Sequence, residues 1–197
     1  NGVGGVDLDR RDAALREEVL AKLGEADWIG VRDGATRAQL AAAGIDARLM
    51  PDPAVLTAEL FGGRIRELTE AGDVAAVRAA FPQGYLAVHF AAAFGDDATL
   101  ARIVAGLAKA AAGRGIVFFR AGAAPWHDDI EVYRRAAAVF RGVDAAPWIF
   151  ESLDIWDICA LIAASAAFCG SSLHGRIVAQ SFGVPVIEGI VPSGEKV

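Results

Sequence analysis

Two serines and a histidine lie where an apolar run meets a helical pattern near the end of the chain. Residues 166–170 are apolar and end at a glycine, and Ser171 and Ser172 follow where a helix prefers its N-cap. The first turn of a helix carries unpaired N–H groups and the positive end of the dipole, so it attracts phosphate or carboxylate. His174 lies in that turn. The pattern predicts an anion site beside a histidine suited to acid or base work on a phosphorylated substrate.

The same residues also have ordinary structural interpretations. At helical spacing, Leu173, Ile177 and Val178 form an apolar face. His174 lies beside that face, so it could be a histidine of the hydrophobic core. The two serines could serve only as helix caps. The residue types by themselves leave the catalytic and the structural interpretation open.

Two parts of the chain resemble signatures of a known family. One is Ser-Ser-Leu-His-Gly-Arg-Ile-Val-Ala at residues 171–179 with Phe-Gly-Val-Pro at 182–185. It is similar to the segment of polysaccharide pyruvyl transferases in which a Leu-His-Gly opens a helix that ends in Gly-x-Pro. The other is Trp-Ile-Gly-Val-Arg-Asp at 28–33 with Pro-Asp-Pro-Ala at 51–54, which resembles the family's Val-Arg-Asp and Pro-Asp segments. Several members of the family carry an arginine where this chain has Ser172.

The resemblance implies an enzyme that moves the pyruvyl group of phosphoenolpyruvate onto sugar hydroxyls in bacterial surface polysaccharide biosynthesis, usually as a cyclic ketal. In such a reaction the enol carbon is protonated, hydroxyls attack the cation-like centre, and phosphate leaves. His174 and Arg32 are the expected catalytic residues, with His174 as the acid or base. Arg32 and Arg120 would neutralise the donor's carboxylate or phosphate, and Ser171 or Ser172 would hold its other anionic end. Neither a metal nor an organic cofactor is expected.

The apolar pattern predicts strands that alternate with helices. Strands are expected at 27–31, 47–50, 85–90, 115–119, 166–170 and 185–187, and helices at 9–23, 36–43, 97–112, 130–140 and 154–164, with the helix of His174 before the last strand. This alternation is typical of βαβ units around a parallel sheet, so the fold class is α/β. The resemblance implies one Rossmann-like unit and part of a second one, as in the paired-domain arrangement of glycosyltransferase-B enzymes.

Glycine and proline positions divide the chain into three parts. Residues 1–53 are expected to be the remaining part of an N-terminal α/β domain, in which Arg32 follows a short strand. Residues 54–82 have a helical pattern interrupted by glycines and are interpreted as a connection. Residues 83–197 are predicted to form the C-terminal Rossmann-like domain that carries the Ser-Leu-His-Gly motif. Because the chain opens in Asn-Gly-Val-Gly-Gly, a larger N-terminal portion is expected to precede it.

The ends of the predicted parallel strands bring further polar residues to one edge of the sheet. His89, Arg120 and Glu188 each lie at or next to the end of a predicted strand. In open α/β sheets the carboxyl edge is where ligands bind, so these three residues are expected to bind substrate. Arg176 is added to this group because it could replace the arginine that family members carry at the position of Ser172.

Composition and charge exclude several classes of function. The net charge of the chain is −6 and no basic stripe appears, so nucleic-acid binding is not expected. Cys159 and Cys169 lie in apolar surroundings without metal-ligand spacing, so buried reduced thiols are expected. His127 precedes Asp128 and Asp129, but one histidine beside two acids is weak evidence for a metal. One of these two acids is interpreted as a helix N-cap.

Residues 158–175 contain no Asp, Glu, Lys or Arg, yet a membrane span is not expected there. The segment includes a glycine, two adjacent serines and His174, and is better interpreted as a helix end, a buried strand and a helix start. No signal peptide is recognised at the start of the sequence. A cytoplasmic protein is therefore expected, with peripheral contact to a membrane only through a lipid-linked acceptor.

Two alternatives to pyruvyl transfer stay open. A glycosyltransferase with the same paired domains would use a nucleotide sugar, and Glu188 is the local carboxylate that could contact the nucleotide. A noncatalytic module that binds or assembles glycans would keep the fold without turnover. Replacement of His174 separates this module from the enzymes, because glycan binding would survive the change.

Overall fold

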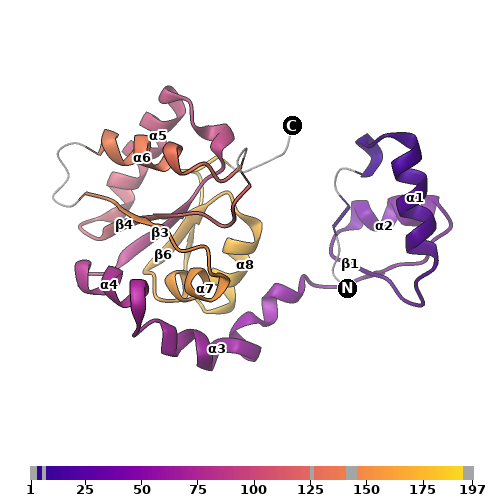
Figure 1. The fold of residues 1–197 in the computed structure, drawn as a ribbon, viewed down its shortest axis with the longest axis horizontal. Helices are drawn as coiled ribbons and strands as arrows, with labels where there is room; N and C mark the ends of the chain where they lie inside the picture. Colours follow the sequence, from indigo (N-terminus) through magenta and orange to yellow (C-terminus); the bar gives the residue numbers. More distant parts are fainter. Residues whose placement is uncertain (1–3, 6–7, 125–126, 141–145, 193–197) are drawn as a thin grey trace. The chain divides into compact units, whose positions relative to one another are not determined.

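The computed structural model describes residues 4–5, 8–124, 127–140 and 146–192, and the chain divides into two compact units. The first unit spans residues 1–55 and the second residues 56–197 (Figure 1). Among these described residues, the first unit has one cluster of buried apolar side chains and the second has two. Each unit therefore has a core of its own, and each is described by itself.

The second unit is built on a five-stranded sheet. Its strands are β3 (Tyr85–His89), β4 (Gly115–Phe119), β5 (Trp148–Phe150), β6 (Ala167–Gly170) and β7 (Val186–Ile187). All are parallel, in the order β5-β4-β3-β6-β7. Ala87 of β3 pairs with Val117 of β4 on one side and with Phe168 of β6 on the other. Every residue of β3, β4 and β6 is buried, as expected for parallel strands covered on both faces.

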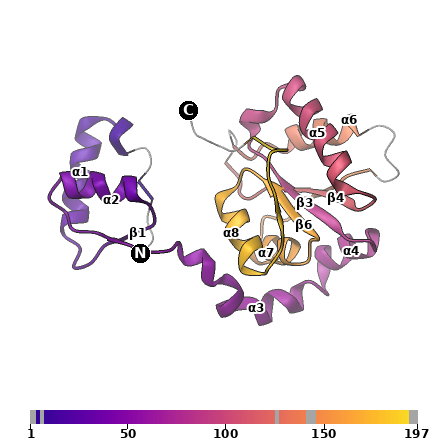
Figure 2. The same ribbon diagram turned by 180° about the vertical axis from the view of Figure 1, so that it is seen from behind.

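Helices cover both faces of this sheet (Figure 1, Figure 2). One layer holds α5 (Asp97–Ala111) and α6 (Ile130–Val139), and the other holds α3 (Thr57–Leu68), α4 (Gly72–Ala80), α7 (Ile155–Ala163) and α8 (Leu173–Ser181). Successive residues of a strand face opposite layers, so Leu86 and Val88 pack with the first layer and Tyr85 and Ala87 with the second. The unit is a three-layer Rossmann-like domain, which confirms the predicted α/β class.

The predicted elements of this unit lie close to the observed ones, and β5 is an addition. Strand β5 is only three residues long, all of them apolar, so the sequence carries no alternating pattern that would mark it. Helix α5 ends at Ala111, one residue before its expected end, because Ala112 adopts a left-handed conformation with φ of 48°. A short 3-10 helix at Ala92–Phe94 follows β3.

Residues 54–82, interpreted from the sequence as a connection, contain α3 and α4. These helices belong to the second unit and pack on α7 and α8. Ile65 of α3 and Val77 of α4 are fully buried in the same cluster as Leu161 of α7. The segment therefore contributes to the core of the second unit, and its role as a connection between two domains stays a prediction.

The first unit is a small α/β unit. It contains α1 (Ala13–Gly24), β1 (Gly30–Val31), α2 (Gly34–Ala42) and β2 (Arg48–Leu49), with a 3-10 helix at Leu8–Arg10 and a second one, Pro53–Leu56, that ends at the first residue of the second unit. The strands are parallel, with Gly30 opposite Arg48. Helix α1 begins at residue 13 rather than at the expected residue 9, because the Asp12 carboxylate accepts the N–H of Ala14 and caps the helix there. The buried cluster consists of Ile29, Val31, Leu40 and Ala47.

The strand order of the second unit creates a topological switch point beside β3. From β3 the chain crosses to β4 and β5 on one side, and then to β6 and β7 on the other. Ligands of open α/β sheets bind at the carboxyl ends of the strands where the order reverses. His89 ends β3 and is the register partner of Gly170, which ends β6. The switch point therefore lies between these two residues.

Candidate functional site

Main-chain and side-chain contacts hold the ends of β3 and β6 together at the switch point. The N–H of Ser171 donates to the carbonyl oxygen of His89 (3.1 Å), and the N–H of Ala91 donates to Oγ of Ser171 (3.3 Å). A Cβ on Gly170 would lie 2.4 Å from the same carbonyl oxygen, so this approach requires glycine. Ser171 thus links the ends of β3 and β6, a structural role in addition to the anion binding expected of it.

Ser172 begins α8 as its N-cap. Its Oγ accepts the N–H of Gly175 (3.1 Å), which confirms the capping interpretation. A Cβ on Gly175 would lie 2.9 Å from the Phe168 ring, so glycine lets the first turn of α8 pack closely on β6. His174 is exposed in this turn, and its interpretation as a core histidine is therefore wrong. Its imidazole lies at a helix N-terminus, where anions bind favourably.

Arg176 and Glu188 form an ion pair between α8 and the residue that follows β7. Nη1 of Arg176 lies 3.0 Å from Oε1 of Glu188, and the two side chains are 33% and 71% exposed. The sequence predicts both as substrate-binding residues but not that they contact each other. An exposed pair of this kind contributes little to stability, so both groups are available to a ligand.

Arg120 follows β4, the neighbour of β3 in the sheet. Its Nη2 donates to the carbonyl oxygen of Glu151 at 3.5 Å. Its Nε is buried and has no hydrogen-bond partner among the described residues. A buried donor without a partner costs about 1–3 kcal/mol. Within the described part of the chain, the guanidinium therefore keeps an unpaired donor next to the carboxyl edge of the sheet.

Three titratable side chains form a cluster at the end of β3. His89 is fully buried, and its Nε2 lies 3.5 Å from Oδ1 of Asp128. Nδ1 of His127 lies 3.3 Å from the same oxygen. Asp128 is also buried. Hydrogen bonding with His89 holds the pKa of the Asp128 carboxyl below its usual value, although burial opposes this shift.

The loop from β4 to α6 places His127 and Asp128 against the end of β3. The N–H of Ala92 donates to the carbonyl oxygen of His127 (2.8 Å). Asp129 caps α6, as one of the two acids was expected to do.

The sequence pattern joins His127 only to its neighbouring acids and misses His89. The sequence does contain a signal for this cluster. His89 ends β3 and His127 and Asp128 follow β4, and the ends of adjacent parallel strands meet at one edge of a sheet. Residues 125–126 of the same run lie outside the described residues.

Arg32, the second residue expected to be catalytic, lies in the first unit at the carboxyl end of β1. Its Nη1 lies 2.6 Å from Oδ2 of Asp52, which follows β2. Oδ1 of Asp52 accepts the N–H of Ala54 (3.0 Å), so one carboxylate stabilises both the turn and the arginine. The structure therefore places Arg32 at the carboxyl edge of its own strand pair, and His174 in the other unit.

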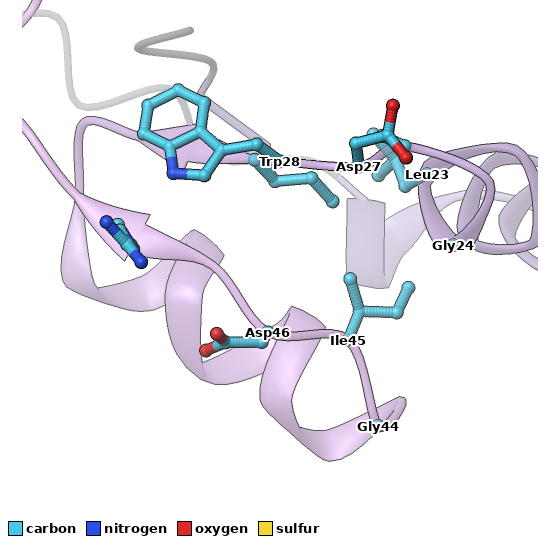
Figure 3. Close-up of a pocket in the computed structure, with 10 residues that line it drawn as sticks. Leu23, Gly24, Asp27, Trp28, Gly44, Ile45 and Asp46 are labelled. Carbon is cyan, nitrogen blue, oxygen red and sulfur yellow. The ribbon is translucent and has the colours of Figure 1, made fainter.

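The first unit has a hollow of about 290 Å³ (Figure 3), and Arg32 is not among its lining residues. It is lined by residues of segments 23–29 and 44–48. Trp28 and Asp46 precede β1 and β2, so the hollow lies at the amino ends of these strands, whereas Arg32 follows a carboxyl end. Ligands of α/β sheets bind at the carboxyl ends, so we assign no substrate to this hollow.

Comparisons with known proteins bear on family and fold. The family model described as polysaccharide pyruvyl transferase matches residues 8–193. The chain is similar in structure to UDP-GlcNAc 2-epimerase from Neisseria meningitidis, solved with bound UDP-GlcNAc, with a TM-score of 0.57 and 14% sequence identity. The similarity covers 94% of this chain and 49% of the epimerase chain, and it shows a glycosyltransferase-B-like fold. The search of curated proteins found no match.

Proposed function

This chain belongs to the polysaccharide pyruvyl transferase family, and we propose that its site transfers the pyruvyl group of phosphoenolpyruvate to two hydroxyls of a saccharide. One observation carries the proposal. The exposed imidazole of His174 lies in the first turn of α8, at the edge of the sheet where an anionic donor would bind. The chain spans about half the length of the epimerase whose fold it shares, so the substrates of the whole enzyme belong to this proposal.

In the proposed reaction His174 acts first as a general acid and then as a general base. The protonated imidazole gives its proton to the terminal methylene carbon of the enol, which leaves a cation-like centre on the neighbouring carbon. One acceptor hydroxyl attacks this centre, and its proton returns to the imidazole. The C–O bond to phosphate then breaks. A second hydroxyl attacks, its proton leaves with the phosphate, and the products are a cyclic ketal and phosphate.

The two anionic groups of the donor need positive partners. We assign Arg120 to one of them, because its buried Nε has no partner among the described residues. Arg32 of the first unit forms an ion pair with Asp52, and its expected role in the reaction stays a prediction. Ser171 and Ser172 each accept a main-chain hydrogen bond through Oγ and keep a hydroxyl proton to donate to the anion.

The acceptor is proposed to contact the pair formed by Arg176 and Glu188. The exposed Glu188 carboxylate can accept hydrogen bonds from sugar hydroxyls, and Arg176 holds it in place from α8. His89 was also expected to bind substrate. Because this side chain is fully buried, we assign it no direct contact with the substrate.

Phosphate release from phosphoenolpyruvate tests the proposal in the presence of saccharides that carry neighbouring hydroxyl pairs. Replacement of His174 by alanine should lower the rate by about 10²–10⁴-fold, the usual contribution of a general acid or base. Gln180→Ala is the matched control, since Gln180 is an exposed residue of the same helix and should leave the rate within about twofold. Calorimetry of phosphoenolpyruvate binding to the same variants separates binding from turnover.

The other outcomes of this experiment discriminate between the alternatives. Binding of a nucleotide sugar but not of phosphoenolpyruvate would contradict pyruvyl transfer and favour a glycosyltransferase. Glycan binding that survives His174→Ala, with no turnover in the wild type, would favour a noncatalytic module. Phosphate release that is equal in wild type and variant would remove His174 from the chemistry.

The proposed partners are small molecules and a saccharide chain. In the part of the chain that the structure describes, no helix combines the length and apolar character needed to cross a membrane. We propose that the enzyme works in the cytoplasm, where phosphoenolpyruvate is available, and that it contacts a membrane only through a lipid-linked acceptor. Release of phosphate with a lipid-linked but not a free saccharide would show that the acceptor has to be presented at a membrane.

A further inference from the structure

His89, His127 and Asp128 present ligand atoms to a common point at the carboxyl edge of the second unit's sheet. His89 ends β3, and the other two lie in the loop between β4 and α6. One ligand atom of each residue lies within 4.8 Å of those of the other two. Imidazole nitrogens and carboxylate oxygens are the donors that bind zinc and other divalent first-row metals. The cluster therefore has the donor set of a metal site.

The distances between these atoms suit metal ligands better than hydrogen bonds. Oδ1 of Asp128 lies 3.5 Å from Nε2 of His89 and 3.3 Å from Nδ1 of His127. A charge-assisted N–H···O⁻ hydrogen bond is about 2.7–2.9 Å long. Two ligands that bind one zinc ion tetrahedrally, each about 2.0–2.1 Å from it, are about 3.3–3.4 Å apart. Both observed separations are close to an edge of such a tetrahedron.

The contacts of His89 do not offset the free-energy cost of burying its imidazole. The side chain is fully buried, and its Nδ1 has no hydrogen-bond partner among the described residues. The Phe119 ring lies 5.7 Å from the imidazole, centroid to centroid, so part of the surroundings is apolar. An imidazole that leaves water loses hydrogen bonds, and a single long contact does not replace them. A bond from Nε2 to a metal ion would offset this loss.

The charge of Asp128 also suits a cation. Its carboxyl is buried, and both of its titratable neighbours in the cluster are imidazoles, with Oδ1 lying 3.5 Å from Nε2 of His89 and 3.3 Å from Nδ1 of His127. A Cβ on Gly122 would lie 3.2 Å from Oδ2, so the absence of a side chain there leaves room for the carboxylate. A buried carboxylate with two imidazoles as its neighbours is well placed to neutralise a divalent ion.

We propose that His89, His127 and Asp128 bind a divalent transition metal ion, with zinc as the best fit. The side chain of His127 is 44% exposed, so the cluster can be reached from solvent through this residue. Three protein ligands with one open position are typical of ions that bind water or a substrate group. The expectation of no metal considered His127 and its adjacent acids alone, whereas the fold adds His89.

Titration of metal-free, tag-free protein with Co²⁺ tests the site, because tetrahedral Co²⁺ absorbs visible light and Zn²⁺ should displace it. We expect one equivalent to bind and to raise the thermal midpoint. Loss of a group that only hydrogen-bonds to a metal ligand costs about 10–100-fold in affinity, so His127→Ala, which removes a ligand itself, should weaken binding at least about tenfold. Asp128→Asn should do the same. His174→Ala removes the third histidine of the chain, outside the cluster, and should leave Co²⁺ binding unchanged.

Two results would overturn the proposal. One is the lack of saturable binding at one equivalent, and the other is binding that His127→Ala and Asp128→Asn leave unchanged. The three side chains would then form only a hydrogen-bonded cluster. The titration uses neither phosphoenolpyruvate nor a saccharide, so its outcome is independent of the proposed pyruvyl transfer.

Discussion

Gly170 lies so close to His89 that a Cβ at position 170 would be 2.4 Å from the His89 carbonyl oxygen. The two residues are register partners at the ends of β6 and β3. Their approach brings Ser171 within hydrogen-bond distance of the end of β3 and sets the start of α8. The glycine thus determines the separation of the strand ends on which the candidate site is built.

Gly170→Ala should therefore destabilise the second unit by about 1–3 kcal/mol, because a backbone carbonyl cannot move aside without disturbing the strand pairing. Gly63→Ala is the matched control, since a Cβ on this helical glycine of the same unit would meet nothing within 4 Å. It should be neutral or stabilise by up to about 1 kcal/mol. Urea unfolding measures both variants. Equal stability of the two would show that the strand ends can separate at no cost.

The pair formed by Arg176 and Glu188 should matter more for turnover than for folding. Arg176→Ala and Glu188→Ala should each change the free energy of unfolding by less than about 1 kcal/mol, because exposed pairs contribute little. Each should lower the rate of phosphate release from phosphoenolpyruvate. Arg134→Ala breaks another exposed pair, with Glu131, and is the control for both measurements. An unchanged rate in all three variants would exclude the pair from the site.

Acid should weaken the first unit through Asp33, the N-cap of α2. The N–H of Thr36 donates to Oδ1 of Asp33 (2.7 Å), and this bond holds the folded-state pKa of the carboxyl below its usual value. Such a group stabilises the fold above its unfolded pKa of about 3.9, and the contribution is lost as the pH falls through the lower folded-state pKa.

The comparison of wild type with Asp33→Asn isolates this effect, since asparagine keeps the capping oxygen without the charge. The stability advantage of the wild type should be largest above about pH 4 and should shrink below it. Urea unfolding at a series of pH values measures the difference between the two proteins. A difference that is constant from about pH 6 to about pH 2 would contradict the assignment.

The two cysteines should be unreactive in the folded protein. Cys159 and Cys169 are free and buried, as expected from the sequence, and burial raises the pKa of each thiol to about 11. Because the thiolate is the reactive species, a disulfide reagent at neutral pH should modify neither thiol in the native state and both in denaturant. Rapid modification of one thiol without denaturant would show that its helix or strand opens locally.

The sequence by itself determined the features that depend on residues close together in the chain. The alternation of strands and helices is confirmed, and so are a cap of α6 at one of two adjacent acids and a cap of α8 at one of two adjacent serines, which the structure identifies as Asp129 and Ser172. Each of these caps joins residues at most three positions apart. Helix periodicity and capping arise from neighbours within about one turn, so a local pattern contains the information that specifies them.

Only the tertiary structure decided which of these elements meet. His89 and Asp128 are 39 positions apart, and Ala91 and Ser171 are 80 positions apart. Both contacts exist because β3 lies between β4 and β6, and no local pattern specifies the order of parallel strands. The exposure of His174 was undecided for the same reason, since a helix face is covered or open according to the elements that pack beside it.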